Sequence, residues 1–129
     1  MTKIVLDASA WVEYLQGGPN AKEVDESLQE HDCLTNLITV AEVVSKVKRR
    51  GFDPQVALNI INSLSRTFYA TPEDAFGAGT LHAEERAKQP HFGLGDSFLI
   101  VCARRLGAKI LTNDHHFKRF KESIMLGKN

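Results

Sequence analysis

Short apolar runs alternate along the chain with longer stretches in which apolar residues recur every three or four positions. The short runs predict strands at residues 3–6, 33–36, 68–70 and 109–112, with an edge strand near 124–126. The longer stretches predict amphipathic helices between them. This alternation indicates an α/β fold, a three-layer α/β/α sandwich with helices on both faces of a mostly parallel central sheet of four to five strands.

Helix boundaries follow from glycine, proline and capping residues. Helices are predicted at residues 10–16, 21–29, 39–50, 54–64, 71–88 and 96–106. Residues 98–103 could form a buried strand on periodicity alone. Asp96 in the N-cap position and Gly107 just past the end favour a helix there instead.

Length and composition predict a single domain over residues 1–129. With 43% hydrophobic residues, such a chain buries roughly two thirds of its unfolded surface. The longest strictly apolar run, residues 98–103, is far shorter than the roughly 20 residues of a membrane helix. Asp7 and Glu13 interrupt any signal-peptide pattern at the start. We therefore expect a cytoplasmic protein without a membrane partner.

Charge and cysteine content narrow the possible partners. Sixteen lysines and arginines balance sixteen aspartates and glutamates, so the chain as a whole has no field that attracts a polyanion. If cations neutralised four of the acids in one pocket, the remaining twelve would leave the surface four charges positive, which is compatible with a phosphate-rich partner. Cys33 and Cys102 lie far apart without a C-x-x-C motif and are expected to be small core residues.

Acidic residues follow the predicted strands at recurring places. Asp7 comes directly after a predicted strand and Asp114 two residues after another, whereas Glu42 and Asp96 fall in the first turn of predicted helices. The carboxyl ends of parallel strands open onto one crevice, where ligands usually bind. We therefore expect all four side chains to lie at the same edge of the sheet.

Each of these acids also has a purely structural explanation. Asp7 could cap the helix that follows it, Asp96 is in N-cap position, and Asp114 could form an Asx turn. Thr39-x-x-Glu42 matches a capping box, in which the glutamate side chain accepts a hydrogen bond from the backbone N–H of the threonine. Any one of the four alone is as well explained by capping as by catalysis.

Taken together, the four acids predict a cation site. Two carboxylates 4 Å apart repel each other by about 4 kcal/mol at an effective dielectric near 20, so a converging set needs protons or cations. An oxygen-only set suits Mg²⁺ or Mn²⁺ better than zinc, and such metals serve phosphodiester hydrolysis in two-metal nucleases. Adjacent side chains diverge, so we do not expect His115 or His116 to be ligands. Three polar residues flank the strand-end acids and could orient the ligands or bound water: Ser9, Thr112 and Asn113.

The chain resembles the PIN-domain ribonucleases over essentially its whole length. The resemblance rests on a strand followed by D-x-S at Asp7 to Ser9, Glu42 early in a helix, G-x-x-D ending at Asp96, and L-T-x-D-x-x-F from Leu111 to Phe117. It is greatest to the small VapC-like toxins of type II toxin-antitoxin pairs. One departure is Asn113, where relatives often carry a basic residue, so a phosphate contact there is expected to be weaker.

This resemblance implies a function and a set of site residues. It implies endonucleolytic cleavage of RNA by water that Mg²⁺ or Mn²⁺ activates, a homodimer, and silencing by a cognate antitoxin protein laid in a groove beside the acids. The metal-binding and catalytic residues that it implies are Asp7, Glu42, Asp96 and Asp114. On helix 54–64, apolar residues around Ile60, Ile61 and Leu64 are a candidate dimer surface.

Two other functions fit parts of the sequence. A haloacid-dehalogenase-like phosphatase also begins with a strand that ends on an aspartate, but it needs a second aspartate two residues on, where this chain has Ser9. A non-catalytic RNA-binding or scaffold PIN domain would keep the fold without turnover, and the presence of all four acids argues against it. The basic run at residues 46–50 reads either as a solvated helix end or as a contact with RNA or antitoxin.

Overall fold

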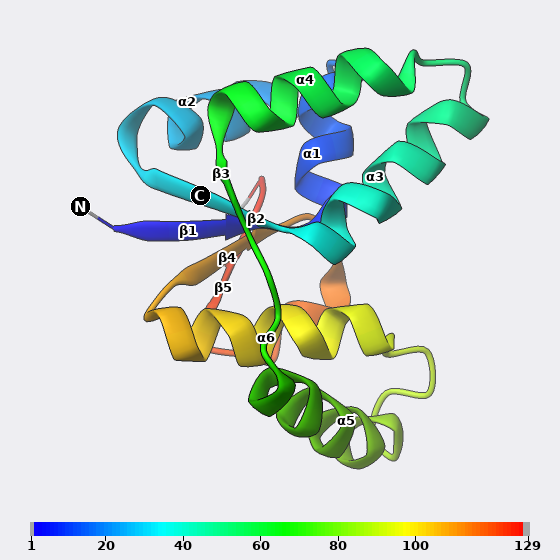
Figure 1. Ribbon diagram of the computed structural model, residues 1–129, viewed down its shortest axis with the longest axis vertical. Coiled ribbons are helices and arrows are strands. Elements are labelled where there is room, and N and C mark those ends of the chain that lie inside the picture. The colour runs from blue at the N-terminus through cyan, green and yellow to red at the C-terminus, as the bar shows by residue number, and fades with distance from the viewer. Residues whose placement is uncertain (1, 128–129) are drawn as a thin grey trace.

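The central sheet is wholly parallel in the computed structural model, which describes residues 2–127 (Figure 1). Five strands lie in the order β3-β2-β1-β4-β5. They are β1 (Lys3–Leu6), β2 (Asp32–Asn36), β3 (Arg66–Phe68), β4 (Lys109–Thr112) and β5 (Ser123–Met125). The predicted α/β class is therefore confirmed, with crossover helices between the strands.

Strand β1 lies at the centre of the sheet, and its sequence explains why. Ile4, Val5 and Leu6 are all almost completely buried, because β1 pairs with β2 on one side and with β4 on the other while helices cover both faces. A strand covered on both faces reads as a continuous apolar run rather than as an alternating one. Ile4 and Leu6 contribute to one core and Val5 to the other.

Helices form a layer on each face of the sheet (Figure 1). One layer contains α1 (Ala8–Leu15), α2 (Ala21–Glu30), α3 (Leu37–Arg49) and α4 (Pro54–Leu64). The opposite layer contains α6 (Leu94–Leu106), with α5 (Pro72–Arg86) packed beside it. A short 3₁₀ helix, η1 (His115–Phe117), follows β4. Within the described residues, no helix combines the length and apolar character needed to cross a bilayer.

Several element boundaries differ from those that the sequence predicts. Strand β3 lies two residues earlier than expected, because its register places Arg66 opposite Leu34 and allows Arg66 to pair with Asp32 at 2.7 Å. Strand β5 begins one residue early, at Ser123. Helix α6 confirms the helical alternative for residues 98–103, but it starts at Leu94 rather than at Asp96.

The predicted dimer surface on α4 is partly wrong. Ile61 is completely buried and belongs to the core that α4 shares with its neighbour α3. Leu64 is exposed as the predicted surface requires, and Val56 is exposed as well, with exposed fractions of 39% and 43%. The apolar residues of α4 thus cover a broad face of the helix. Part of this face packs in the core, and the rest is exposed to solvent. Both cysteines are buried, as expected.

Trp11 is the largest fully buried side chain and couples α1 to the sheet. Its Nε1–H donates to Thr35 Oγ1 at 3.1 Å, and Thr35 Oγ1 lies 2.8 Å from Ser65 Oγ. We expect Trp11→Ala to lower the free energy of unfolding by about 3–5 kcal/mol, because it opens a cavity and removes a buried donor. Urea denaturation measures the change. As a control, Tyr69→Ala removes an aromatic ring that is 75% exposed and should change stability by at most about 0.5 kcal/mol. Equal losses in the two variants would contradict this assignment.

Candidate functional site

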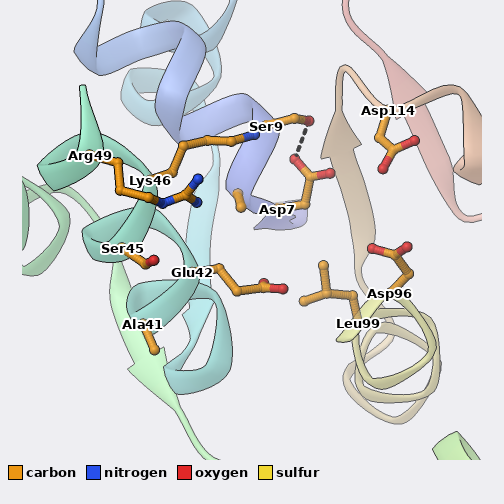
Figure 2. A pocket seen from close by; sticks show the side chains of 11 residues that line it. Asp7, Ser9, Ala41, Glu42, Ser45, Lys46, Arg49, Asp96, Leu99 and Asp114 are labelled. Atoms are coloured by element: carbon orange, nitrogen blue, oxygen red, sulfur yellow. Dashed lines mark hydrogen bonds between the residues drawn. The ribbon is translucent and has the colours of Figure 1, made fainter. Parts of the chain in front are cut away.

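A hollow of about 530 Å³ opens at the edge of the sheet where β1 and β4 end (Figure 2). Asp7 follows β1, Asp114 follows β4, Glu42 projects from α3, and Asp96 lies in the first turn of α6. All four carboxylates line this hollow, together with Ala8, Ser9, Ala41, Ser45, Lys46, Arg49 and Leu99.

Asp7 is the most buried of the four acids, with an exposed fraction of 4%. Its Oδ1 accepts hydrogen bonds from the Ala10 N–H at 2.9 Å and from the Ser9 hydroxyl at 2.7 Å, and its Oδ2 accepts one from the Thr112 hydroxyl. The predicted capping role is therefore confirmed, because the bond from Ala10 makes Asp7 the N-cap of α1. These bonds also hold the carboxylate in one orientation at the base of the hollow.

Ser9 and Thr112 connect the ends of the two central strands. Ser9 Oγ accepts a hydrogen bond from the Asn113 N–H at 2.8 Å, and Thr112 Oγ1 accepts one from the Asp114 N–H at 2.9 Å. Since both hydroxyls also donate to Asp7, they fix the position of Asp114 relative to Asp7. The Asn113 side chain takes no part in this network and lies instead 3.5 Å from Glu13 Oε1.

The capping box predicted for Thr39 and Glu42 does not form. Asn36 is the N-cap of α3, with its side chain accepting from the Ile38 N–H at 3.0 Å, so Thr39 lies inside the helix. Within residues 2–127, the Glu42 carboxylate makes no hydrogen bond or ion pair to another side chain. The structural explanation for Glu42 is thereby removed, and its oxygens are available to a ligand.

Glu42 extends to the start of α6, where Asp96 lies. Gly95 makes this close approach possible, since a Cβ atom at that position would lie 2.9 Å from Glu42 Oε2. Asp96 is not the N-cap of α6 but its third residue, and its Oδ2 accepts a hydrogen bond from the Gly93 N–H at 3.1 Å. The positive end of the helix dipole therefore faces both carboxylates.

Desolvation and mutual repulsion disfavour the ionised form of three of these acids, of which Asp7 is buried, Asp96 is half-buried and Glu42 is exposed. Burial raises the pKa of the Asp7 carboxyl to about 6, although its hydrogen bonds act in the opposite direction. Desolvation raises the pKa of Glu42, and the neighbouring Asp96 adds to the shift. Desolvation likewise raises the pKa of Asp96, with a smaller contribution from Asp114. A bound cation would relieve this cost, because it favours the charged forms.

His116 lies beside Asp114 and orients it. Its backbone N–H donates to Asp114 Oδ1 at 2.9 Å, which confirms the predicted Asx turn, and its Nδ1 lies 2.9 Å from the same oxygen. One ligand atom from each of Asp96, Asp114 and His116 can be chosen so that all lie within 4.8 Å of one another. Because an ionised carboxylate only accepts hydrogen bonds, Nδ1 donates and is not free for a metal. His116 leaves Asp114 Oδ2 available.

A set of polar contacts around the buried Glu85 positions the segment that carries Asp114. Gln89 Nε2 donates to His116 O at 3.1 Å and to Glu85 Oε2 at 3.0 Å, and Arg119 Nε lies 3.1 Å from the same Glu85 oxygen. Gln89 is not among the residues that the sequence predicts to be functional, since nothing local distinguishes a glutamine in a loop. Ser45 is not among them either, although its spacing from Glu42 puts it on the same face of α3.

The chemistry of the donor set fits a hard divalent cation. Both carboxylate oxygens of Glu42, Oδ1 of Asp96 and Oδ2 of Asp114 accept no hydrogen bond within the described residues. The Asp7 carboxylate is fixed beside them. None of the four acids forms an ion pair with a lysine or arginine in that part of the chain. Oxygen ligands of this kind suit Mg²⁺ or Mn²⁺.

The fold and site together define a class: a parallel α/β protein with an acidic hollow at the carboxyl edge of its sheet. Within this class the chain belongs to the PIN domain family, whose profile matches residues 4–123. No curated protein matches it significantly in sequence.

Solved structures share the whole fold at low sequence identity. A toxin-antitoxin complex from Klebsiella pneumoniae superposes with a TM-score of 0.76 at 16% identity, covering 95% of this chain and 96% of the other. VapBC2 from Rickettsia felis, solved bound to a promoter DNA fragment, gives 0.73 at 22% identity, with 96% and 97% covered. Mycobacterium tuberculosis VapC20, described as a sarcin-ricin loop cleaving toxin, gives 0.71 at 15%, with 85% and 87% covered.

The raised pKa of Asp7 predicts a pH-dependent stability in the absence of metal. A carboxyl whose pKa is higher in the folded than in the unfolded state contributes most below its unfolded pKa of about 4, and this contribution is lost as pH rises through about 6. In EDTA, we expect Asp7→Asn to gain about 2 kcal/mol relative to the wild type between about pH 4.5 and about pH 7.5. Urea denaturation across this range measures the gain. As a control, Glu26→Gln on the exposed surface of α2 should show the same dependence of the free energy of unfolding on pH as the wild type. The same pH dependence in Asp7→Asn would contradict the raised pKa of Asp7.

Proposed function

We propose that this chain is a metal-dependent endoribonuclease and the toxin of a toxin-antitoxin pair. The observation that supports this most strongly is the hollow, in which four carboxylates from distant parts of the chain converge without forming an ion pair to a lysine or arginine in the described residues. Such an arrangement costs stability unless a cation is bound. A cost of this kind at a sheet edge is typical of a site kept for function.

In this proposal Asp7, Glu42, Asp96 and Asp114 hold Mg²⁺ or Mn²⁺. The bound metal would polarise a phosphodiester and lower the pKa of water. The protein orients the ligands, since hydroxyl and backbone groups fix Asp7 and His116 fixes Asp114. Glu42 and Asp96 face each other from different helices, so a metal between them would also tie α3 to α6.

RNA is the substrate that the family context favours. PIN domains are typically nucleases, and M. tuberculosis VapC20 is described as cleaving the sarcin-ricin loop. The charge balance is compatible with a polyanion, because neutralising four of sixteen acids leaves the rest of the surface net positive. We place this activity in the cytoplasm.

An antitoxin partner and a homodimer are part of the same proposal. The neighbours from K. pneumoniae and R. felis were solved as toxin-antitoxin complexes. An apolar groove beside α4, lined by Tyr14, Val56, Ile60 and Leu64 among others, offers surface for a protein partner. Trp11 is fully buried and contributes nothing to it.

Cleavage assays with Asp96→Asn test the enzymatic part. We expect purified wild type to cut structured RNA in Mg²⁺ and to be inactive in EDTA. Asp96→Asn should cut at least about a hundredfold more slowly, because one ligand charge is lost while the hydrogen bond from Gly93 can persist. Glu26→Gln, which removes a carboxylate far from the hollow, should cleave like the wild type. Gel analysis of end-labelled RNA measures the rates.

The possible outcomes separate the candidate functions. Equal cleavage by wild type, Asp96→Asn and the EDTA sample would indicate a contaminant or another site. RNA binding without products in any sample would favour the non-catalytic scaffold function.

Expression in a bacterial host tests the toxin part. We expect wild-type protein to stop growth, Asp96→Asn to permit it, and co-expression of the product of an adjacent small reading frame to restore growth of the wild-type strain. Colony counts after induction measure the effect. Growth arrest by Asp96→Asn equal to that by the wild type would show that toxicity does not depend on the hollow.

A further inference from the structure

We propose that Lys46 and Arg49 bind the phosphates that flank the scissile phosphate of a single RNA strand. This inference rests on the proposed function, because it assigns the substrate path of the same hollow. It concerns the wall formed by α3, opposite Asp114, which the metal-binding acids do not explain.

The helical spacing directs both cations into the hollow. Positions 42, 45, 46 and 49 recur at helical intervals, so Glu42, Ser45, Lys46 and Arg49 share one face of α3, and all four line the hollow. Figure 2 shows the Lys46 side chain extending toward Ser9, with the Arg49 guanidinium beside it, whereas Glu42 extends toward Asp96 and α6. One face of the helix therefore carries an acid near the metal site and bases farther along.

Within the described residues, no hydrogen bond or ion pair uses the donors of Lys46 and Arg49, although the charge of Lys46 acts to lower the pKa of Glu42. By contrast, the described ion pairs of the other arginines are Arg66–Asp32, Arg104–Glu122, Arg105–Asp74 and Arg119–Glu85. Two cations left without partners beside four acids are therefore available to a ligand that carries negative charge.

The helix dipole accounts for cations at the end of α3 but not for their direction. Lys48 and Arg50 belong to the same basic run, and a cation anywhere in this turn complements the dipole. Neither lines the hollow, and the Arg50 guanidinium donates to Gln16 Oε1 at 2.6 Å. Among the basic residues 46, 48, 49 and 50, all described in the structure, Lys46 and Arg49 alone combine this position with a place in the lining of the hollow. This combination distinguishes a ligand site from a solvated helix end.

Repulsion explains why an RNA strand needs cations at this place. Metals in the acidic site would hold one phosphate. The next phosphates along the strand are also negatively charged and lie near the same carboxylates, which repel them. Lys46 offers a point charge and Arg49 a planar fork that binds two phosphate oxygens, and Ser45 adds a hydroxyl donor. Contacts of this kind position the strand without reading its bases. The wall would therefore serve RNA of any sequence.

Salt-dependent binding tests the inference without requiring cleavage. In an Asp96→Asn background with Mg²⁺, we compare Lys46→Gln/Arg49→Gln with the matched control Lys48→Gln/Arg86→Gln, which removes the same charge from exposed positions outside the hollow. Fluorescence anisotropy follows a labelled single-stranded RNA between about 0.05 and about 0.2 M salt. We expect the hollow variant to bind about tenfold more weakly, with a salt slope lower by about 1.4, since each phosphate contact on a single strand contributes about 0.7. The control should keep the parent slope.

Steady-state kinetics in the wild-type background separate a change in KM from a change in kcat, and a partly unfolded variant would not change KM alone. Lys46→Gln/Arg49→Gln should raise KM for a long RNA about tenfold and leave kcat within about twofold, because flanking contacts hold ground state and transition state alike. On a dinucleotide with a single phosphodiester, its kcat/KM should equal that of the control. Urea denaturation should show equal stability for the two double variants.

Failure of the inference is distinguishable from failure of the proposed function. Metal-dependent cleavage with an unchanged salt slope and KM would overturn the inference and leave the nuclease intact. RNA binding that depends on Lys46 and Arg49 without cleavage by the wild type would support phosphate binding by these two residues while the nuclease proposal fails. Equal losses in the hollow and control variants, or no RNA binding by the Asp96→Asn parent, would also overturn the inference.

Discussion

The buried carboxylate of Asp7 is the constraint on which the site depends. A charge with so little solvent exposure is costly, and the surrounding structure reduces the cost with three hydrogen bonds rather than with a basic side chain. Two of these bonds come from Ser9 and Thr112, which also accept from the backbone beyond β4. The same two hydroxyl groups thus stabilise the Asp7 carboxylate and join the ends of the two central strands at this edge.

Structural and functional explanations of the acids do not exclude each other. Asp7 caps α1 and Asp114 closes an Asx turn, yet both line the hollow. Capping uses one oxygen of Asp114 and leaves the other free. A carboxylate held by backbone donors has a defined direction, so local structure supplies the orientation that a metal ligand needs. Glu42 is the exception, because it has no such support and depends on the approach that Gly95 permits.

Sequence predicts the central elements well because their signals are local. β1 and β4 each contain a short apolar run that an acid follows, directly at Asp7 and two residues beyond Thr112 at Asp114, and a glycine ends α6. The start of α3 is missed because Asn36 competes successfully with Thr39 for the cap, and the two are equally plausible by residue type. The burial of Ile61 depends on which side of α4 packs against α3. Contacts such as Gln89 with His116 join residues far apart in sequence and have no local pattern.

The Gln89 amide has a consequence for the geometry of the whole site. Its two N–H groups join the end of α5 to the segment after β4, while the chain continues from Gln89 through Phe92, stacked on Phe120, into the first turn of α6. The hydrogen bonds of Gln89 therefore help to set the distance between Asp96 and Asp114, although Gln89 contacts neither side chain. A change of length in the connection between α5 and α6 would alter the span between these carboxylates without replacing either one.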